Sequence, residues 1–79
     1  MPKGSNIVHQ YFRKELDGLT ILIKLNPIHF QITEITVSKA GETHLREIEA
    51  DQDIHDDLVA DGFQESSALE FNLYFAGLA

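Results

Sequence analysis

Residues 8–26 read VHQYFRKELDGLTILIKLN, and this stretch decides the first half of the fold. The dipeptide Asp17-Gly18 at its centre suits the positive φ angles of a type I′ turn, and apolar and polar residues alternate on either side of it. A two-residue loop at this turn pairs Phe12 with Ile23. The stretch therefore predicts an antiparallel β-hairpin with one apolar face and one largely polar face, which is typical of a sheet covered on one side.

A third strand is predicted over residues 28–39, after Pro27, which cannot donate a hydrogen bond within a sheet. The apolar residues of this segment change parity between Ile32 and Ile35, so a regular strand with one buried face cannot place both in the core. A β-bulge at residues 33–34 would reconcile them. We therefore predict a bulged third strand.

A turn at residues 40–42 leads to a fourth predicted strand over residues 43–49. A three-residue loop at this turn would pair Val37 with Leu45. Leu45 and Ile48 are three residues apart, a spacing that also suits a helix, and a helix is therefore the alternative for this segment.

A helix is predicted over residues 53–60, where apolar residues recur at helical spacing. These apolar residues are Ile54, Leu58 and Val59. Asp51 or Asp53 can cap the N-terminus of the helix, and Gly62 stands where a residue in the left-handed conformation commonly ends one.

The last predicted element is a strand over residues 68–75, because apolar residues alternate there with polar ones. A helix is the alternative, since Ser67 and Glu70 have the spacing of a capping box and Gly77 could close the helix. In a helix, however, Asn72 would fall inside the apolar arc. We therefore favour the strand.

Together these elements predict an α+β fold: a single small domain with an antiparallel sheet of four to five strands, in the order ββββαβ, and one helix packed on one face. The domain is predicted to span residues 6–79, and residues 1–5 are predicted to form a flexible tail. A chain of 79 residues without cysteine has no disulfide to reinforce its small core. We therefore expect modest stability, which dimerisation would increase.

The charged residues are distributed unevenly along the chain. Residues 1–46 contain six bases and four acids, whereas residues 47–79 contain nine acids and no base. The net charge of −7 argues against nucleic acid or an anionic membrane as a ligand, because phosphate groups are bound by clustered Lys and Arg. The acidic second half favours instead a protein partner with a basic surface.

The predicted helix is the first candidate surface for such a partner. Asp53, Asp57 and Asp61 are four residues apart and line one side of it, with Asp56 beside them. Like charges at this spacing destabilise a helix slightly, and an acid near the C-terminus is unfavourable. The simpler interpretation of the same residues is a solvated face that aids solubility.

The side of the sheet that the predicted helix leaves open is the second candidate surface. Tyr11, Leu22 and Tyr74 are predicted to point outward there and to form a modest apolar patch. Sheets with one covered face often pair through the other. These three residues are therefore the second set of predicted partner-binding residues and a route to a homodimer.

No motif in the sequence indicates catalysis, and we expect no catalytic residue, bound metal or cofactor. None of the histidines has a metal-binding spacing, and each is interpreted as a surface residue. The histidines are His9, His29, His44 and His55. The acids around His55 suggest a cation site, but the segment lacks the glycine and the further oxygen ligand that an EF-hand loop requires.

The main functional hypothesis is a small non-catalytic interaction module of the adaptor, inhibitor or immunity type that docks on a basic partner surface. The alternatives are a metal-dependent enzyme that uses the Asp/His cluster at residues 51–57, and a self-assembling structural subunit. The absence of cysteine and of an apolar N-terminal signal segment favours the cytoplasm.

Overall fold

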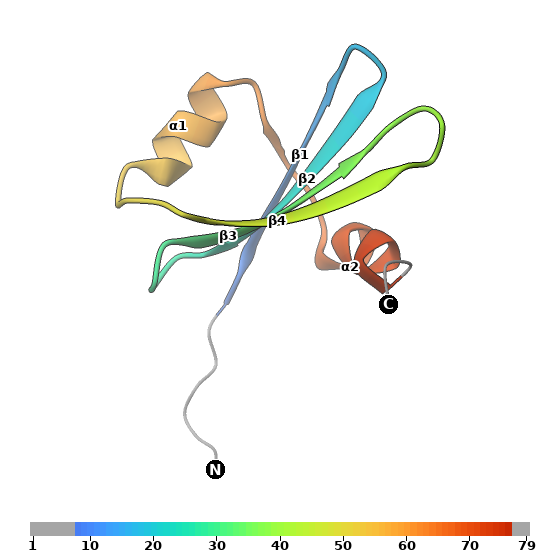
Figure 1. Cartoon of the computed structure of the whole chain (residues 1–79). Helices are drawn as coiled ribbons and strands as arrows, with labels where there is room; N and C mark the ends of the chain where they lie inside the picture. The colour runs from blue at the N-terminus through green and yellow to red at the C-terminus, as the bar shows by residue number, and fades with distance from the viewer. Residues whose placement is uncertain (1–7, 77–79) are drawn as a thin grey trace.

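The computed structural model of the chain describes residues 8–76, which form five strands and two helices (Figure 1). In chain order the elements are β1 (Gln10–Leu16), β2 (Leu19–Asn26), β3 (Gln31–Val37), β4 (Thr43–Glu49), α1 (Ile54–Ala60), β5 (Gln64–Glu65) and α2 (Ala68–Ala76). The strands form one antiparallel sheet in the order β4-β3-β2-β1-β5. The predicted α+β fold is therefore confirmed. The predicted tail at residues 1–5 lies outside the described residues.

The hairpin of β1 and β2 has the predicted register. Phe12 pairs with Ile23, and Leu16 pairs with Leu19 across the two-residue turn. Asp17 and Gly18 have φ angles of 53° and 82°, as a type I′ turn requires.

The third strand begins later than predicted, because residues 27–30 form a tight turn. The backbone N–H of Phe30 donates to the carbonyl of Asn26 at 2.8 Å, and the side-chain oxygen of Asn26 accepts the N–H of Ile28 at 2.9 Å. Phe30 itself has a φ of 54°, an unusual conformation for a bulky residue. The strand can therefore start only at Gln31.

The predicted bulge at residues 33–34 is wrong, because β3 pairs without interruption with β2 on one side and β4 on the other. The turn after β3 also lies one residue earlier than predicted. The backbone N–H of Ser38 donates to the carbonyl of Glu42 at 2.8 Å, which leaves residues 39–41 as the loop. Leu45 therefore pairs with Ile35 rather than with Val37.

The sheet needs no bulge because both of its faces are buried. One face carries the α1 core, which packs residues of β1, β2 and β3 against α1: Phe12, Ile23, Leu25, Ile32 and Leu58. The opposite face carries the α2 core, which consists of Leu22, Ile35 and Phe71. The change of parity within β3 thus places Ile32 in one core and Ile35 in the other.

The first helix forms where the sequence predicts it and is closed by Gly62, as predicted. Gly62 has a φ of 91°, its N–H donates to the carbonyl of Val59, and the N–H of Phe63 donates to that of Leu58. These two bonds are those of a Schellman motif. The expected N-cap is only partly correct, because Asp53 occupies the cap position but its carboxylate makes no capping hydrogen bond.

The predicted strand at residues 68–75 is wrong, because this segment is the helix α2. The hydroxyl oxygen of Ser67 accepts the backbone N–H of Glu70 at 3.1 Å, which is the capping bond that the sequence offered as the alternative. The short strand β5 precedes α2 and pairs with β1. The element order is therefore ββββαβα, with one helix on each face of the sheet (Figure 1).

Candidate interaction surfaces

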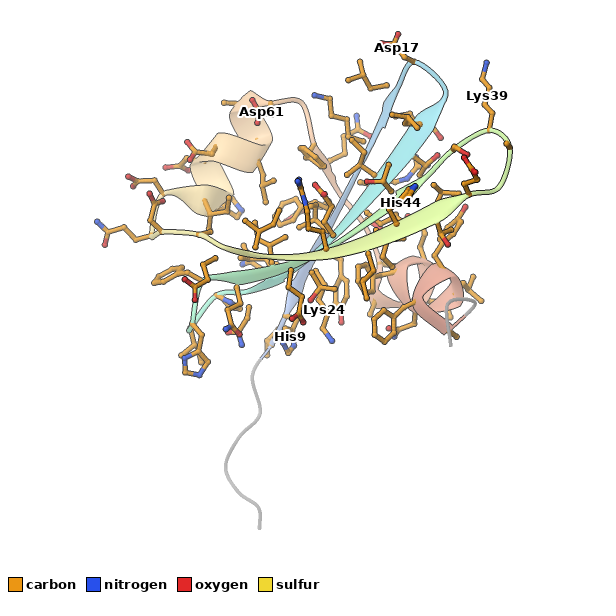
Figure 2. All side chains as sticks on the ribbon, viewed as in Figure 1. His9, Asp17, Lys24, Lys39, His44 and Asp61 are labelled. Carbon is orange, nitrogen blue, oxygen red and sulfur yellow. The ribbon has the colours of Figure 1, made fainter. Side chains whose placement is uncertain are left out.

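Five aspartates form one continuous exposed group on α1 and the loop that leads into it. We call this group the acidic surface: Asp51, Asp53, Asp56, Asp57 and Asp61. All five residues are exposed. Asp53 stands at the N-cap and Asp61 at the C-cap, so the group extends along the whole helix, and Figure 2 shows Asp61 at its end.

The carboxylates of the acidic surface form no ion pair with Lys or Arg among residues 8–76. The Lys or Arg ion pairs of the described residues lie elsewhere, at Arg13 and Arg46. On α1 itself the structure shows one contact between a basic and an acidic side chain, in which Nδ1 of His55 lies 3.8 Å from a carboxylate oxygen of Asp56. The carboxylates therefore leave a concentrated negative potential above the helix.

Only one of these carboxylates, that of Asp51, accepts a hydrogen bond from the backbone at the N-terminal end of α1. One oxygen of Asp51 accepts the N–H of Asp53 at 3.0 Å, and no side-chain oxygen bonds the first turn. At the other end Lys14, on β1, donates through Nζ to the carbonyl of Asp61 and lies 5.5 Å from the centre of the Phe63 ring. This amine supplies the positive charge that the last turn of α1 lacks.

The second predicted surface is largely covered, because α2 packs on the side of the sheet that was expected to be open. Leu22 is 0% exposed, so its predicted role in a surface patch is wrong. Tyr11 is half-buried, and its ring lies 5.6 Å from that of Phe71 on α2. Of the three residues, Tyr74 alone is exposed.

The sequence prediction missed an exposed apolar surface on α2. Phe71 points into the sheet and is 2% exposed, whereas Leu69 and Leu73 are 70% and 67% exposed. We call the exposed apolar side of this helix the α2 outer face: Leu69 and Leu73 form its centre, and the partly exposed Tyr74 and Phe75 lie at its margins. Reading the segment at a period of 3.6 residues instead of two would have revealed it.

A polar cluster fixes α2 to β1. Arg13 lies 2.8 Å from a carboxylate oxygen of Glu15 and 3.3 Å from one of Glu70, and Ser66 donates its hydroxyl to Glu70 at 2.7 Å. The hydrogen bond to Glu15 and the charge of Glu70 raise the pKa of Arg13 above its ordinary value. The single acid of α2 is therefore already occupied by contacts within the chain.

The residues described by the structure contain no group of three or more His, Asp or Glu side chains that could hold a metal ion. The ring of His55 packs edge-on against the ring of Phe12, with 5.6 Å between the ring centres. Two other histidines, His9 and His44, lie on opposite faces of the sheet (Figure 2). The cluster predicted as a metal-dependent alternative is thus not arranged as a ligand set.

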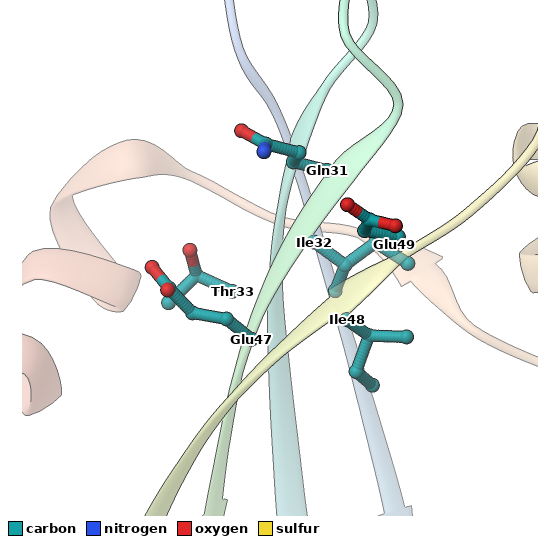
Figure 3. A pocket seen from close by; sticks show the side chains of 6 residues that line it. All are labelled: Gln31, Ile32, Thr33, Glu47, Ile48 and Glu49. Carbon is teal, nitrogen blue, oxygen red and sulfur yellow. The ribbon is translucent and has the colours of Figure 1, made fainter.

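A hollow of about 200 Å³ lies along the β3–β4 edge (Figure 3). Its lining residues are Gln31, Ile32, Thr33, Glu47, Ile48 and Glu49. Thr33 pairs with Glu47 on one face of the sheet, and the neighbouring pair of Ile32 and Ile48 lies on the other face. The lining residues therefore belong to both faces, and the hollow wraps around the edge of the sheet. It does not enclose a set of converging polar groups of the kind that defines a ligand pocket.

Comparison of the chain with protein-family models, curated proteins and solved structures gives no match. Neither of the two helices within residues 8–76 has the length and apolar content needed to cross a membrane. The function must therefore be inferred from the surfaces themselves. These are one exposed acidic helix and one exposed apolar helix, on opposite faces of the sheet.

Proposed function

We propose that this protein is a non-catalytic interaction module that binds a basic surface of a partner protein through its acidic surface. The observation that carries the proposal is the group of five exposed aspartates whose carboxylates form no ion pair with a Lys or Arg among the described residues. Carboxylates that form no ion pair with a Lys or Arg in the described part of the chain are available to pair with a partner. An adaptor, an inhibitor or an immunity-type protein would use such a surface.

The helix that carries these carboxylates is held firmly in place. Leu58 is 5% exposed and joins the α1 core, and the Schellman motif fixes the C-terminal end of the helix. A partner would therefore meet a preorganised array of charges and would lose little free energy in ordering it. Electrostatic attraction over several ångströms would accelerate association, and the affinity would fall as salt is added.

The net charge of −7 supports a protein partner over nucleic acid or an anionic membrane, both of which would be repelled. We also propose that the protein acts in the cytoplasm. The support is that the sequence contains no cysteine, whereas small secreted domains commonly depend on disulfides.

The test is a charge-reversal experiment with a matched control. The variant Asp57→Lys/Asp61→Lys changes the acidic surface, and Glu47→Lys/Glu49→Lys changes two exposed acids on the opposite face of the sheet by the same net charge. The two variants and the wild-type chain are used at low salt to capture proteins from a lysate, and captured proteins are then purified and titrated individually.

The proposal requires a purified partner that binds wild type and the Glu47/Glu49 variant alike, loses affinity for the Asp57/Asp61 variant, and dissociates as salt is raised. Equal binding to all three chains would contradict a role for the acidic surface. An equal loss of affinity in both variants would show that only total charge matters. The five aspartates would then be a solvated face without a binding role.

A further inference from the structure

We propose that the α2 outer face is the interface of a homodimer, in which two copies of the chain pack their α2 helices together about a twofold axis. This inference is independent of the proposed acidic interaction, because it concerns the opposite face of the sheet. It begins from the observation that α2 carries large apolar residues on its outer side as well as on the side that packs on the sheet. A surface helix normally has one apolar side, and a helix with apolar residues all round is normally covered on every side.

The inner half of α2 is already packed. Phe71 contacts the sheet through Leu22 and Ile35, and the ring of Phe75 stacks on that of Phe71 with 5.8 Å between their centres and 22° between their planes. The two leucines on the opposite side have no such neighbours, since two thirds or more of each remains exposed. Nothing within residues 8–76 covers them.

Leu69 and Leu73 are four residues apart and therefore form a ridge along the outside of the helix. Ridges of this spacing on two helices interdigitate when the helices cross at about −50°. In a twofold arrangement each copy would place Leu69 and Leu73 against the same residues of the other copy. The surface is then complementary to itself, as an isologous contact requires.

The distribution of charge is compatible with a second copy as the occupant. Two chains that each carry a net charge of −7 repel each other in most orientations. The α2 outer face carries no charged side chain, and Glu70 is directed to Arg13 and Ser66 instead. The acidic surface lies with α1 on the other face of the sheet (Figure 1). Contact through α2 therefore keeps the two acidic surfaces apart.

The size of the patch also suits a dimer. A stable interface buries roughly 800 Å² on each partner, and about 65% of that is apolar in a homodimer. Large apolar side chains each contribute roughly 150–250 Å² when fully exposed, so the four residues of the α2 outer face expose on the order of 400 Å². Leu45, which is exposed on the same face of the sheet, can add to this area. The patch thus supplies most of the apolar area that a dimer needs.

The test is sedimentation equilibrium from about 10 µM to 1 mM protein, a range that covers weak and moderate dimers. We expect wild type to dimerise as its concentration rises. Leu73→Asp should raise the dimer dissociation constant at least about 100-fold, because the change acts in both copies. The control Val59→Asp introduces the same charge at an exposed apolar position of α1 and should leave the constant unchanged.

A monomer across the whole concentration range would overturn the proposal, and would indicate that a different protein covers α2. A dimer unaffected by Leu73→Asp would also overturn it. Isotope-filtered NMR on a mixture of labelled and unlabelled chains supplies a second criterion. Intermolecular contacts are expected between the methyl groups of Leu69 and Leu73, whereas contacts at β4 without any at these two leucines would identify the sheet edge as the interface and overturn the proposal. Far-ultraviolet circular dichroism shows that each variant is folded.

Discussion

The two helices of this molecule pack on the same sheet but differ in what their outer sides offer. α1 joins a core with five buried residues, and its outer side is acidic. α2 joins a core with three buried residues, and its outer side carries leucine and aromatic residues. The difference shows that one face of the domain is complete in water, while the other retains apolar surface that an additional contact could bury.

The largest expected effect of a substitution on either face concerns its central phenylalanine. Phe12→Ala in the α1 core and Phe71→Ala in the α2 core should each lower the free energy of unfolding by about 3–5 kcal/mol. Urea denaturation followed by fluorescence or circular dichroism measures these losses. They would be a large part of the stability of so small a domain.

Amide hydrogen exchange then distinguishes the two cores. Phe71→Ala should release α2 first, so that exchange rises mainly at residues 68–76, because this helix contacts the sheet through few residues. Phe12→Ala should raise exchange throughout the sheet. Identical exchange profiles in the two variants would show that the cores unfold as one unit.

A second comparison tests whether α2 truly covers its face of the sheet. Leu22 and Leu45 both point to that face, but Leu22 is 0% exposed and Leu45 is 50% exposed. Leu22→Ala should cost about 3 kcal/mol in the free energy of unfolding, and Leu45→Ala less than about 1 kcal/mol. Similar small losses at both positions would mean that α2 does not stay on the sheet in solution.

The helix N-termini offer a third and smaller contrast. Ser67→Ala removes the capping hydrogen bond to Glu70 and should cost about 1 kcal/mol, whereas Asp53→Ala removes no such bond and should change stability by less than about 0.5 kcal/mol. Thermal unfolding of both variants beside wild type measures the difference. A larger loss at Asp53 would show that its carboxylate caps α1 in solution.

The smallest predicted effect concerns the C-terminus of α1. Lys14→Met removes the amine that bonds the Asp61 carbonyl but keeps an unbranched side chain over Phe63, and should cost about 0.5 kcal/mol at low salt. Lys39→Met, at the exposed β3–β4 turn, changes the net charge equally and serves as the control. The difference between the variants in urea denaturation should shrink as salt is added. Equal losses would assign the effect to net charge.

Local signals predicted the elements that depend on local interactions. Asp17-Gly18 specifies the first hairpin through its backbone angles, and Gly62 ends α1 for the same reason. The acidic surface was also predictable, because aspartates four residues apart on a helix must lie on one side. In each case the residues that decide the structure are close together in the sequence.

The predicted bulge in β3 and the predicted strand at residues 68–75 were wrong for one physical reason, which is the assumption that only one face of the sheet is buried. Under that assumption the parity change between Ile32 and Ile35 required a bulge. The same assumption led us to interpret the alternation at residues 68–75 as a strand. In α2 this alternation arises because Phe71 and Phe75 face the sheet side while Leu69 and Leu73 face outward. Packing of this segment against the sheet, rather than its alternating pattern, therefore decided that it is a helix.

The position of α2 in the chain has a consequence for the nascent protein. The four strands β1 to β4 precede α2 in the chain and pair with one another without it, so a folding chain can form the sheet while Leu22 and Ile35 are still uncovered. Uncovered apolar strands are prone to join other chains. The interval between the formation of the sheet and the docking of Phe71 is therefore when this protein is most vulnerable to aggregation, and when a chaperone would protect it best.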